Sequence, residues 1–261
     1  MNRYYPNDMN SEDVKNLCTN IVGLNKNFYS SSNEHQRNTS PPRCQIFRRD
    51  SQYLVFEGDQ IKIPHGHMGL RAEIHFGVII EIECSECPKE KAMDFVAGYV
   101  AVLNTRLRNS NYEAKGKAIA ETHDFPSCIA MSPIIHKKFV EHPHACTIWA
   151  SANGAEFQQA PLTDMVKTIP EVIEHVSRVI TLTRGDLLLC GTSTDGHGVQ
   201  AGDVIEMGIE NTIRCVFPVV KFSEVQAAEP TSSNFIENKA QAGTMLDRDA
   251  QEGEEKEEKI D

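Results

Sequence analysis

Residues 70–80 read Leu-Arg-Ala-Glu-Ile-His-Phe-Gly-Val-Ile-Ile, a run in which apolar side chains dominate. Such a run, rich in β-branched residues, is typical of a β-strand. Side chains of a strand alternate between its two faces, so Glu73 and His75 are predicted to lie on the same face. A second apolar run, residues 96–103, is followed by Asn104. The two runs therefore predict two strands that carry a few polar side chains.

Strand signals extend outward from this region along much of the chain. Alternating apolar positions reach residue 103, and strands are expected again over residues 186–222. Helices are expected only as short elements, over residues 11–17, over residues 88–98 and from Pro170 onward. The apolar stripe of the last helix comprises Val172, Ile173, Val176, Val179 and Ile180. This pattern favours a mixed, β-rich α+β fold.

The chain has 261 residues, enough to bury one substantial core with small appendages. We expect a polar N-terminal extension over residues 1–20, one domain over residues 21–225, and an acidic, low-complexity tail over residues 226–261. The tail contains Ala, Glu, Ser, Asn and Gly before an acidic run. Such a segment cannot bury enough apolar surface to fold alone.

The composition argues against two classes of function. The formal net charge is −11 and no basic stripe is visible, so a nucleic-acid-binding surface is not expected. No apolar run reaches the roughly 18 residues that a membrane-spanning helix needs, so no transmembrane segment is expected.

Cysteine usage indicates a reducing compartment. Several of the eight cysteines, such as Cys190 and Cys215, lie inside apolar runs, where a free thiol behaves as a small hydrophobic side chain. Cys84 and Cys87 form a lone C-x-x-C motif that is followed by Pro88. Because a zinc site would need a second pair nearby, this motif is predicted to be a plain turn.

The order and spacing of further motifs resemble the fumarylacetoacetate hydrolase family, which includes acylpyruvases and oxaloacetate decarboxylases. The most specific match is Ile180–Thr192, which is similar to the family's pattern Leu-x-x-Gly-Asp-x-Ile-x-x-Gly-Thr-Pro. The other matching segments are Ile21–Asn25, Glu57–Gly58, Ala92–Tyr99, Trp149 with Asn153–Gly154, and Ala201–Glu206. The resemblance implies a fold of rolled mixed β-sheets with a few short helices.

In the family that the chain resembles, three carboxylates on these two strands hold Mg²⁺ or Mn²⁺. Here the corresponding residues are Glu73, His75 and Asn104, so the charge of the ligand set falls from −3 to −1. Mg²⁺ prefers anionic oxygen ligands, and its affinity is expected to fall steeply. Imidazole suits zinc, copper or nickel, and the neighbouring His65 and His67 leave such an ion open. The other interpretation is that His75 is a strand histidine satisfied by a polar neighbour.

The resemblance also implies catalytic positions that this chain fills with other residue types. The family's lid carries a His and a Glu that act as the general base, and these positions fall on Tyr29 and Ser32. His35 lies nearby but would require a shifted register. The family's substrate-binding Lys falls on Glu121 or Thr122.

Gly191 and Thr192 match the family's substrate-pocket loop, although they would shape that loop even without catalysis. Because two of the three metal ligands, the base and the Lys all differ, we expect a pseudoenzyme that serves as a structural or accessory subunit of a larger protein assembly. Its expected partners are other protein subunits, or a second copy in a homodimer, and no cofactor is expected. The resemblance implies a mitochondrial location, with a cytoplasmic one as the alternative.

Two other functions stay open. One is an active, metal-dependent acylpyruvate hydrolase or oxaloacetate decarboxylase with an altered metal site, which would use Mg²⁺ or Mn²⁺. The other is a small-molecule sensor that binds its ligand near Glu73 without turnover.

Addition of Mg²⁺ is expected to leave the melting temperature of the protein unchanged, because a ligand stabilises the native state only where it binds. Mn²⁺ and Zn²⁺ are the comparison ions in the same thermal-shift measurement. A clear rise in melting temperature, together with turnover of oxaloacetate or an acylpyruvate, would contradict this expectation and favour the active enzyme.

Overall fold

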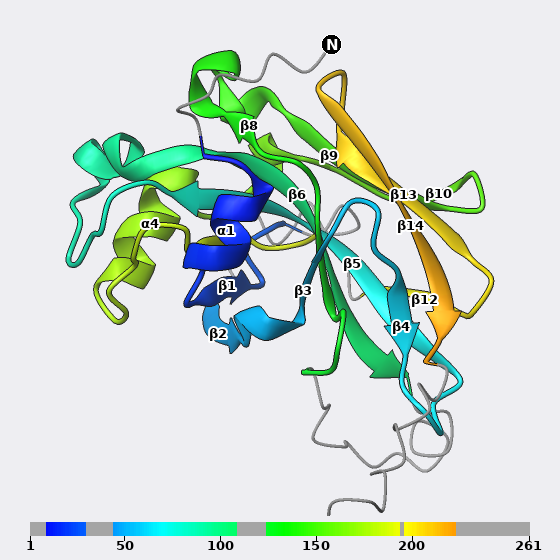
Figure 1. Cartoon of the computed structure of the whole chain (residues 1–261). Helices are drawn as coiled ribbons and strands as arrows, with labels where there is room; N and C mark the ends of the chain where they lie inside the picture. Colours follow the sequence, from blue (N-terminus) through cyan, green and yellow to red (C-terminus); the bar gives the residue numbers. More distant parts are fainter. Residues whose placement is uncertain (1–8, 30–43, 109–123, 194–195, 223–261) are drawn as a thin grey trace, which may run out of the picture. The chain divides into compact units, whose positions relative to one another are not determined.

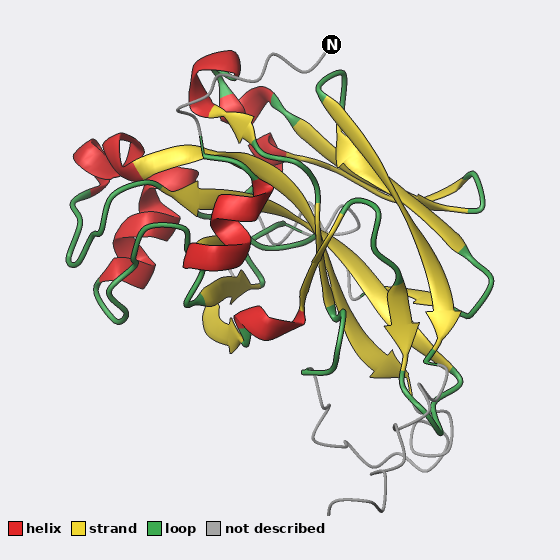
Figure 2. Ribbon diagram, in the orientation of Figure 1, coloured by secondary structure: helices red, strands yellow, loops and turns green. Residues whose placement is uncertain are grey.

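The computed structural model describes residues 9–29, 44–108, 124–193 and 196–222 (Figure 1). Two β-sheets and a few short helices make up this part of the chain (Figure 2). The expected β-rich α+β fold with mixed sheets is therefore confirmed. The acidic tail expected over residues 226–261 lies outside the described residues.

The larger sheet has nine strands. They are β1 (Ile21–Asn25), β2 (Gln45–Arg49), β3 (Leu54–Phe56), β5 (Gly69–Ile80), β6 (Val96–Arg108), β7 (Ile129–Met131), β8 (Ile135–His136), β11 (Leu187–Leu189) and β12 (His197–Val199). The main path runs in the order β2-β1-β11-β5-β6-β7-β3, while β12 pairs with β5 and β8 pairs with β6. The pairs β1–β11 and β3–β7 are parallel, and the other pairs are antiparallel.

The smaller sheet has five strands, in the order β10-β9-β13-β14-β4. Their bounds are Ile61–Ile63 for β4, Thr147–Ala152 for β9, Ala155–Pro161 for β10, Val204–Ile209 for β13 and Ile213–Lys221 for β14. Only β14 and β4 pair in parallel. The Asn153–Gly154 hairpin that the sequence predicted joins β9 to β10, and both of its residues have positive φ, 53° and 81°.

The pairing of β5 with β6 forms the centre of the larger sheet. The two strands run antiparallel over nearly their whole lengths. Most residues of β5 are buried whichever way they point, which explains why its apolar side chains form an almost continuous run. The same register places Glu73 directly opposite Asn104, so this pairing assembles the polar residues that the sequence singled out.

Helix α1 (Ser11–Leu17) confirms the helix expected over these residues. Its N-cap is Asn10, whose side-chain oxygen accepts hydrogen bonds from the N–H groups of Glu12 and Asp13. The Asp13 carboxylate in turn accepts from the Asn10 N–H, so a capping box begins the helix.

Helix α4 (Ile169–Ser177) is shorter than its predicted stripe. It buries Val172, Ile173 and Val176 as expected, but Val179 is 70% exposed and lies beyond the helix together with Ile180. The prediction is wrong at this end because the Ser177 carbonyl accepts a hydrogen bond from the N–H of Glu86 instead of from a further helical turn.

Short 3-10 helices connect several strands. They are η1 (Ser51–Tyr53), η2 (Lys89–Phe95), η3 (Lys137–Phe139), η4 (Pro143–Ala145) and η5 (Leu162–Asp164). The element η2 replaces the helix expected over residues 88–98, because the chain already enters β6 at Val96. None of the helices in the described ranges is long and apolar enough to cross a membrane.

All eight cysteines are free thiols. Cys190 and Cys215 are completely buried, and burial raises the pKa of each to about 12, so both stay protonated. Cys84 and Cys87 lie in the turn that follows β5, where the sequence predicted a turn.

Asp186 joins the segment before β1 to the segment before β11 through hydrogen bonds. Its buried carboxylate accepts hydrogen bonds from the backbone N–H groups of Thr19, Asn20 and Thr183 at 3.1, 2.8 and 2.7 Å. The side chains of the same three residues also donate to it. This carboxylate therefore satisfies a set of donors that the fold would otherwise leave without acceptors.

Asp186→Ala is expected to lower the free energy of unfolding by about 3 kcal/mol or more, because the variant loses six hydrogen bonds to a buried carboxylate and each contributes roughly 0.5–1.5 kcal/mol. Urea denaturation measures the change. Asp203→Ala is the matched control, since Asp203 accepts from a backbone N–H and from Asn153 at the surface, and its loss should cost no more than about 1 kcal/mol. Equal losses in the two variants would contradict the role assigned to Asp186.

Candidate active site

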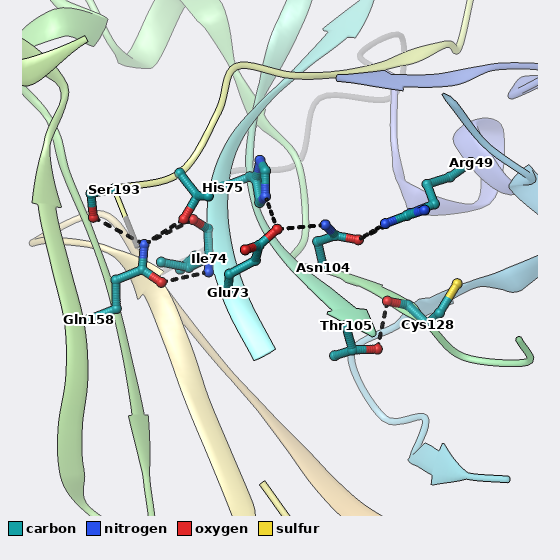
Figure 3. Close-up of polar contacts among 10 residues, drawn as sticks. Arg49, Glu73, Ile74, His75, Asn104, Thr105, Cys128, Gln158 and Ser193 are labelled. Carbon is teal, nitrogen blue, oxygen red and sulfur yellow. Dashed lines mark hydrogen bonds and ion pairs between the residues drawn. The ribbon is translucent and has the colours of Figure 1, made fainter. Parts of the chain in front are cut away.

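Strands β5 and β6 bring Glu73, His75 and Asn104 together at the centre of the larger sheet (Figure 3). Oε1 of Glu73 accepts a hydrogen bond from Nδ2 of Asn104 at 2.8 Å and lies 3.1 Å from Nε2 of His75. The exposed fractions of Glu73, His75 and Asn104 are 9%, 0% and 5%. The three side chains thus form one buried polar cluster around a single carboxylate oxygen.

The contact with Glu73 decides which nitrogen of His75 carries the proton. An ionised carboxylate only accepts hydrogen bonds, so Nε2 of His75 must be the donor. In the neutral imidazole Nδ1 then holds a lone pair, and it is buried without a hydrogen-bond partner among the described residues. The interpretation of His75 as a strand histidine satisfied by its neighbour therefore holds for one nitrogen and fails for the other.

Arg49, at the end of β2, reaches this cluster from a distant part of the sheet order (Figure 3). Its Nε and Nη2 groups donate to Oδ1 of Asn104, each at 3.3 Å. The side chain is 8% exposed, and its Nη1 lies 3.9 Å from a carboxylate oxygen of Asp124. Burial lowers the pKa of the guanidinium, while the charges of Asp124 and Glu73 act in the opposite direction. Because an arginine pKa starts above 12, the group keeps its positive charge.

The neighbours of Glu73 hold it in its ionised form. Burial alone would raise the pKa of this carboxyl group, but the hydrogen bonds from His75 and Asn104 and the nearby charge of Arg106 outweigh burial. The pKa of Glu73 is therefore lowered from its ordinary value. A buried carboxylate at neutral pH is the electrostatic centre of the site.

Further arginines flank the cluster on the same strand face. Arg71 lies two residues before Glu73 on β5, and Arg106 lies two residues after Asn104 on β6. The register pairs Arg71 with Arg106, so the two lie side by side next to the Glu73–Asn104 pair. Positive charge therefore predominates along this face, around one buried carboxylate.

Gln158, on β10 of the smaller sheet, fixes the backbone of the site. Its Oε1 accepts from the N–H of Ile74 at 2.9 Å, and its Nε2 donates to the Ile74 carbonyl at 3.2 Å and to the Thr192 hydroxyl at 2.8 Å. A β-bulge at Phe157 shifts the register between Glu156 and Gln158, and Gln158 is buried while Phe157 is only half-buried. A side chain of the smaller sheet thus holds the backbone of Ile74, the residue between Glu73 and His75.

The loop at Gly191 and Thr192 lies beside this contact. Gly191 has φ +111°, and a Cβ atom there would lie 2.7 Å from the Cβ of Asn27, so only glycine fits. Asn27 donates from Nδ2 to the carbonyl of Cys190 at 2.7 Å and so holds the loop against β1. The expected pocket remnant is therefore packed against the segment that follows β1, and Thr192 also contacts Gln158 beside the site.

Of the other expected catalytic positions, Tyr29 is the one that lies within the described residues. Tyr29 ends a described segment, where its N–H donates to the carbonyl of Asp164 at 2.9 Å. Ser32, Glu121 and Thr122 lie outside the described residues.

The expectation that His65 and His67 could join His75 around a softer metal ion is wrong. Both precede β5, whereas His75 lies six residues into that strand, at a distance of about 20 Å along it. In the part of the chain that the structure describes, no three His, Cys, Asp or Glu side chains gather closely enough to hold a metal ion.

The donor set at Glu73 does not fit Mg²⁺ or Mn²⁺. Among the described residues of this cluster only Glu73 offers an anionic oxygen, and Asn104 directs its NH₂ group toward it. Turning the Asn104 amide round would place its oxygen against the Glu73 carboxylate and its NH₂ against the donors of Arg49. The Asn104 oxygen therefore binds the Arg49 guanidinium, and it is not free to serve as a ligand of a divalent ion beside Glu73.

The chain is an α+β protein with two mixed β-sheets, and it carries a buried polar cluster on the central strand pair β5–β6. A family model described as fumarylacetoacetate (FAA) hydrolase C-terminal matches residues 19–220, and the chain belongs to this family. A rat protein named oxaloacetate tautomerase FAHD1, mitochondrial, is 32% identical over 202 residues, which are 77% of this chain and 91% of that protein. The human protein of the same name is 30% identical over 204 residues, with 77% and 92% covered.

Solved structures share the fold. A 5-carboxymethyl-2-hydroxymuconate delta-isomerase from Mycobacterium smegmatis matches with a TM-score of 0.69 at 20% identity, covering 80% of this chain and 81% of that one. A maleylpyruvate hydrolase from Sphingobium sp. SYK-6, in complex with a manganese(II) ion and pyruvate, matches with a TM-score of 0.64 at 22% identity. That match covers 77% of this chain and 70% of that one. A metal cofactor therefore occurs among proteins with this fold.

These comparisons correct the expected function. The expectation of a pseudoenzyme serving as a structural subunit is wrong, because relatives that match over nine-tenths of their length are named as enzymes. They favour the alternative of an active enzyme of this family. The expected mitochondrial location is confirmed by the same relatives, which are named as mitochondrial proteins.

Glu73 is expected to stabilise the fold in a pH-dependent way. Its folded-state pKa lies below the unfolded value of about 4.3, so its contribution is complete above roughly pH 5 and is lost as the pH falls through the folded-state pKa. The stability difference between the wild type and Glu73→Gln, measured by denaturation, should therefore shrink as the solution is acidified. The same series for Glu141→Gln, which changes an exposed carboxylate, is the control. A difference that stays constant with pH would contradict the lowered pKa.

Proposed function

We propose that the protein is an enzyme of short oxo acids that moves a proton between the carbon next to a carbonyl group and the carbonyl oxygen. The substrate class follows from the relatives that are named oxaloacetate tautomerase, and oxaloacetate is the first substrate to test. The observation that carries the reaction type is the buried pair of Glu73 and His75, whose Nδ1 atom has no partner among the described residues. A positioned imidazole with a lone pair is a suitable base for such a proton.

In the proposed reaction His75 is the base and Glu73 orients it. The proton on the carbon next to the carbonyl passes to Nδ1, and the electron pair of the C–H bond moves into the C–C bond while the carbonyl oxygen becomes negative. Glu73, 3.1 Å from Nε2, stabilises the imidazolium that forms. Nδ1 then returns the proton to the oxygen, which gives the enol. Hydrolysis or decarboxylation of an oxo acid would need stabilisation of the same kind of enolate.

The imidazole is buried, so a substrate must displace side chains that cover it. Phe47 is one of them, because its ring packs against that of His75 with 6.2 Å between the centroids. Its ring also fills the space beside Gly23, where a Cβ atom would lie 2.3 Å from Phe47. Phe47 belongs to β2, the strand that also carries Arg49, so opening the site involves this edge strand of the larger sheet.

His75→Gln is expected to lower kcat for oxaloacetate tautomerisation by about a hundredfold or more, the usual loss when a general base is removed. The decay of enol absorbance in the ultraviolet follows the reaction. His142→Gln, at an exposed position, is the matched control and should retain wild-type kcat. A His75→Gln enzyme with an unchanged rate and an unchanged melting temperature would exclude this residue as the base.

A further inference from the structure

The most unusual feature of the site is a buried guanidinium with unused donors. Arg49 has five N–H groups, and its hydrogen bonds to the described residues use those on Nε and one on Nη2. Its ion pair with Asp124 is long, 3.9 Å, and the Asp124 side chain is 46% exposed. The Arg49 side chain itself is 8% exposed. A charged group that is buried to this degree is costly unless it is paired, so the remaining donors call for an anionic partner.

The second unsatisfied group lies in the same chain of contacts. Figure 3 shows His75, Glu73, Asn104 and Arg49 linked in sequence by hydrogen bonds, with His75 and Arg49 at the two ends. Nδ1 of His75 is buried without a partner among the described residues. His75, at one end of this series of hydrogen bonds, can thus accept a proton, and Arg49, at the other end, can bind an anion.

The proposed proton transfer needs both His75 and Arg49. When a proton leaves carbon, negative charge appears on an oxygen of the substrate, and this charge must be stabilised inside a buried site. A divalent ion could do so, but the amide of Asn104 is held in the orientation that turns donors, not oxygens, toward Glu73. Arg49 supplies the positive charge in the place where that amide oxygen points.

We propose that Arg49 binds the carboxylate or enolate oxygens of the oxo acid through its unused N–H groups, so that the reaction at this site needs no divalent metal ion. This inference rests on the proposed function and adds the means by which the anion is held. A planar guanidinium suits two adjacent oxygens of a carboxylate, because two parallel N–H groups match their spacing. Arg71 and Arg106 on the same strand face add positive charge that favours a dianionic acid over a monoanionic one.

The test uses the full-length protein and two measurements in excess EDTA. The first is the rate of oxaloacetate tautomerisation with EDTA and then with added Mn²⁺, and the two rates should agree within about twofold. The second is calorimetric binding of oxalate, an unreactive dicarboxylate, with EDTA present. Arg49→Met should weaken oxalate binding by about tenfold or more, as expected when a charged hydrogen-bonding partner is removed.

Two further variants separate a binding role from a merely structural one. Arg49→Lys keeps the charge without the planar fork and should recover part of the lost affinity, and it serves if Arg49→Met melts at a much lower temperature. Arg48→Met is the matched control on the neighbouring position of the strand, and it should bind oxalate as the wild type does.

The outcomes are distinguishable. A rate that is lost in EDTA and restored by Mn²⁺ overturns the metal-independent site and leaves the proposed function standing. Absence of turnover under both conditions overturns the proposed function, and the oxalate measurement still judges the role of Arg49. Oxalate binding that is equal in the wild type and in a folded Arg49→Met variant overturns the inference.

Discussion

The hydrogen bonds that converge on Oε1 of Glu73 are the interaction on which the site depends. A carboxylate buried this deeply is tolerated only with donors and opposite charge around it. Asn104 and His75 supply the donors because the pairing of β5 with β6 sets one opposite Glu73 and strand alternation sets the other on the same face. The protonated nitrogen of His75 and the orientation of the Asn104 amide both follow from this one oxygen. Arg49 then completes the arrangement by binding the amide oxygen that Glu73 leaves facing away.

The replaced family residues do not imply a loss of activity, because the metal ligands are only one part of the site. Replacing two carboxylates by His75 and Asn104 does weaken the case for a magnesium ion. The same replacements introduce an imidazole and a neutral amide, and a guanidinium binds that amide. In the function that we propose, the site has changed its source of positive charge and has kept a group that can transfer a proton. Enzymes named for oxaloacetate tautomerisation, matched over nine-tenths of their length, are consistent with that view.

The sequence predicted those parts of the structure that depend on local periodicity. The strands around Glu73 and Asn104, the α1 helix and the Asn153–Gly154 turn follow from alternation, capping and turn chemistry. Arg71 and Arg106 could have been found by extending the period of two from Glu73 and Asn104.

Contacts that depend on the rolling of the sheet could not be predicted. Arg49 lies on β2, at the far end of the main strand path from β6, and only the rolled sheet brings its side chain to Asn104. The end of α4 was missed because a hydrogen bond between Glu86 and Ser177 replaces a helical one. Gln158 was missed because its inward direction depends on an irregularity in β10 rather than on strict alternation.

That irregularity gives the smaller sheet a part in chemistry that it does not touch. The extra residue Phe157 turns Gln158 inward, and Gln158 holds the peptide of Ile74, the link between Glu73 and His75. If Phe157 instead took a regular place in the strand pairing, Gln158 would face the opposite side of β10, away from the larger sheet. The alignment of His75 with Glu73 thus depends on the strand register of a neighbouring sheet as well as on the Gln158 side chain.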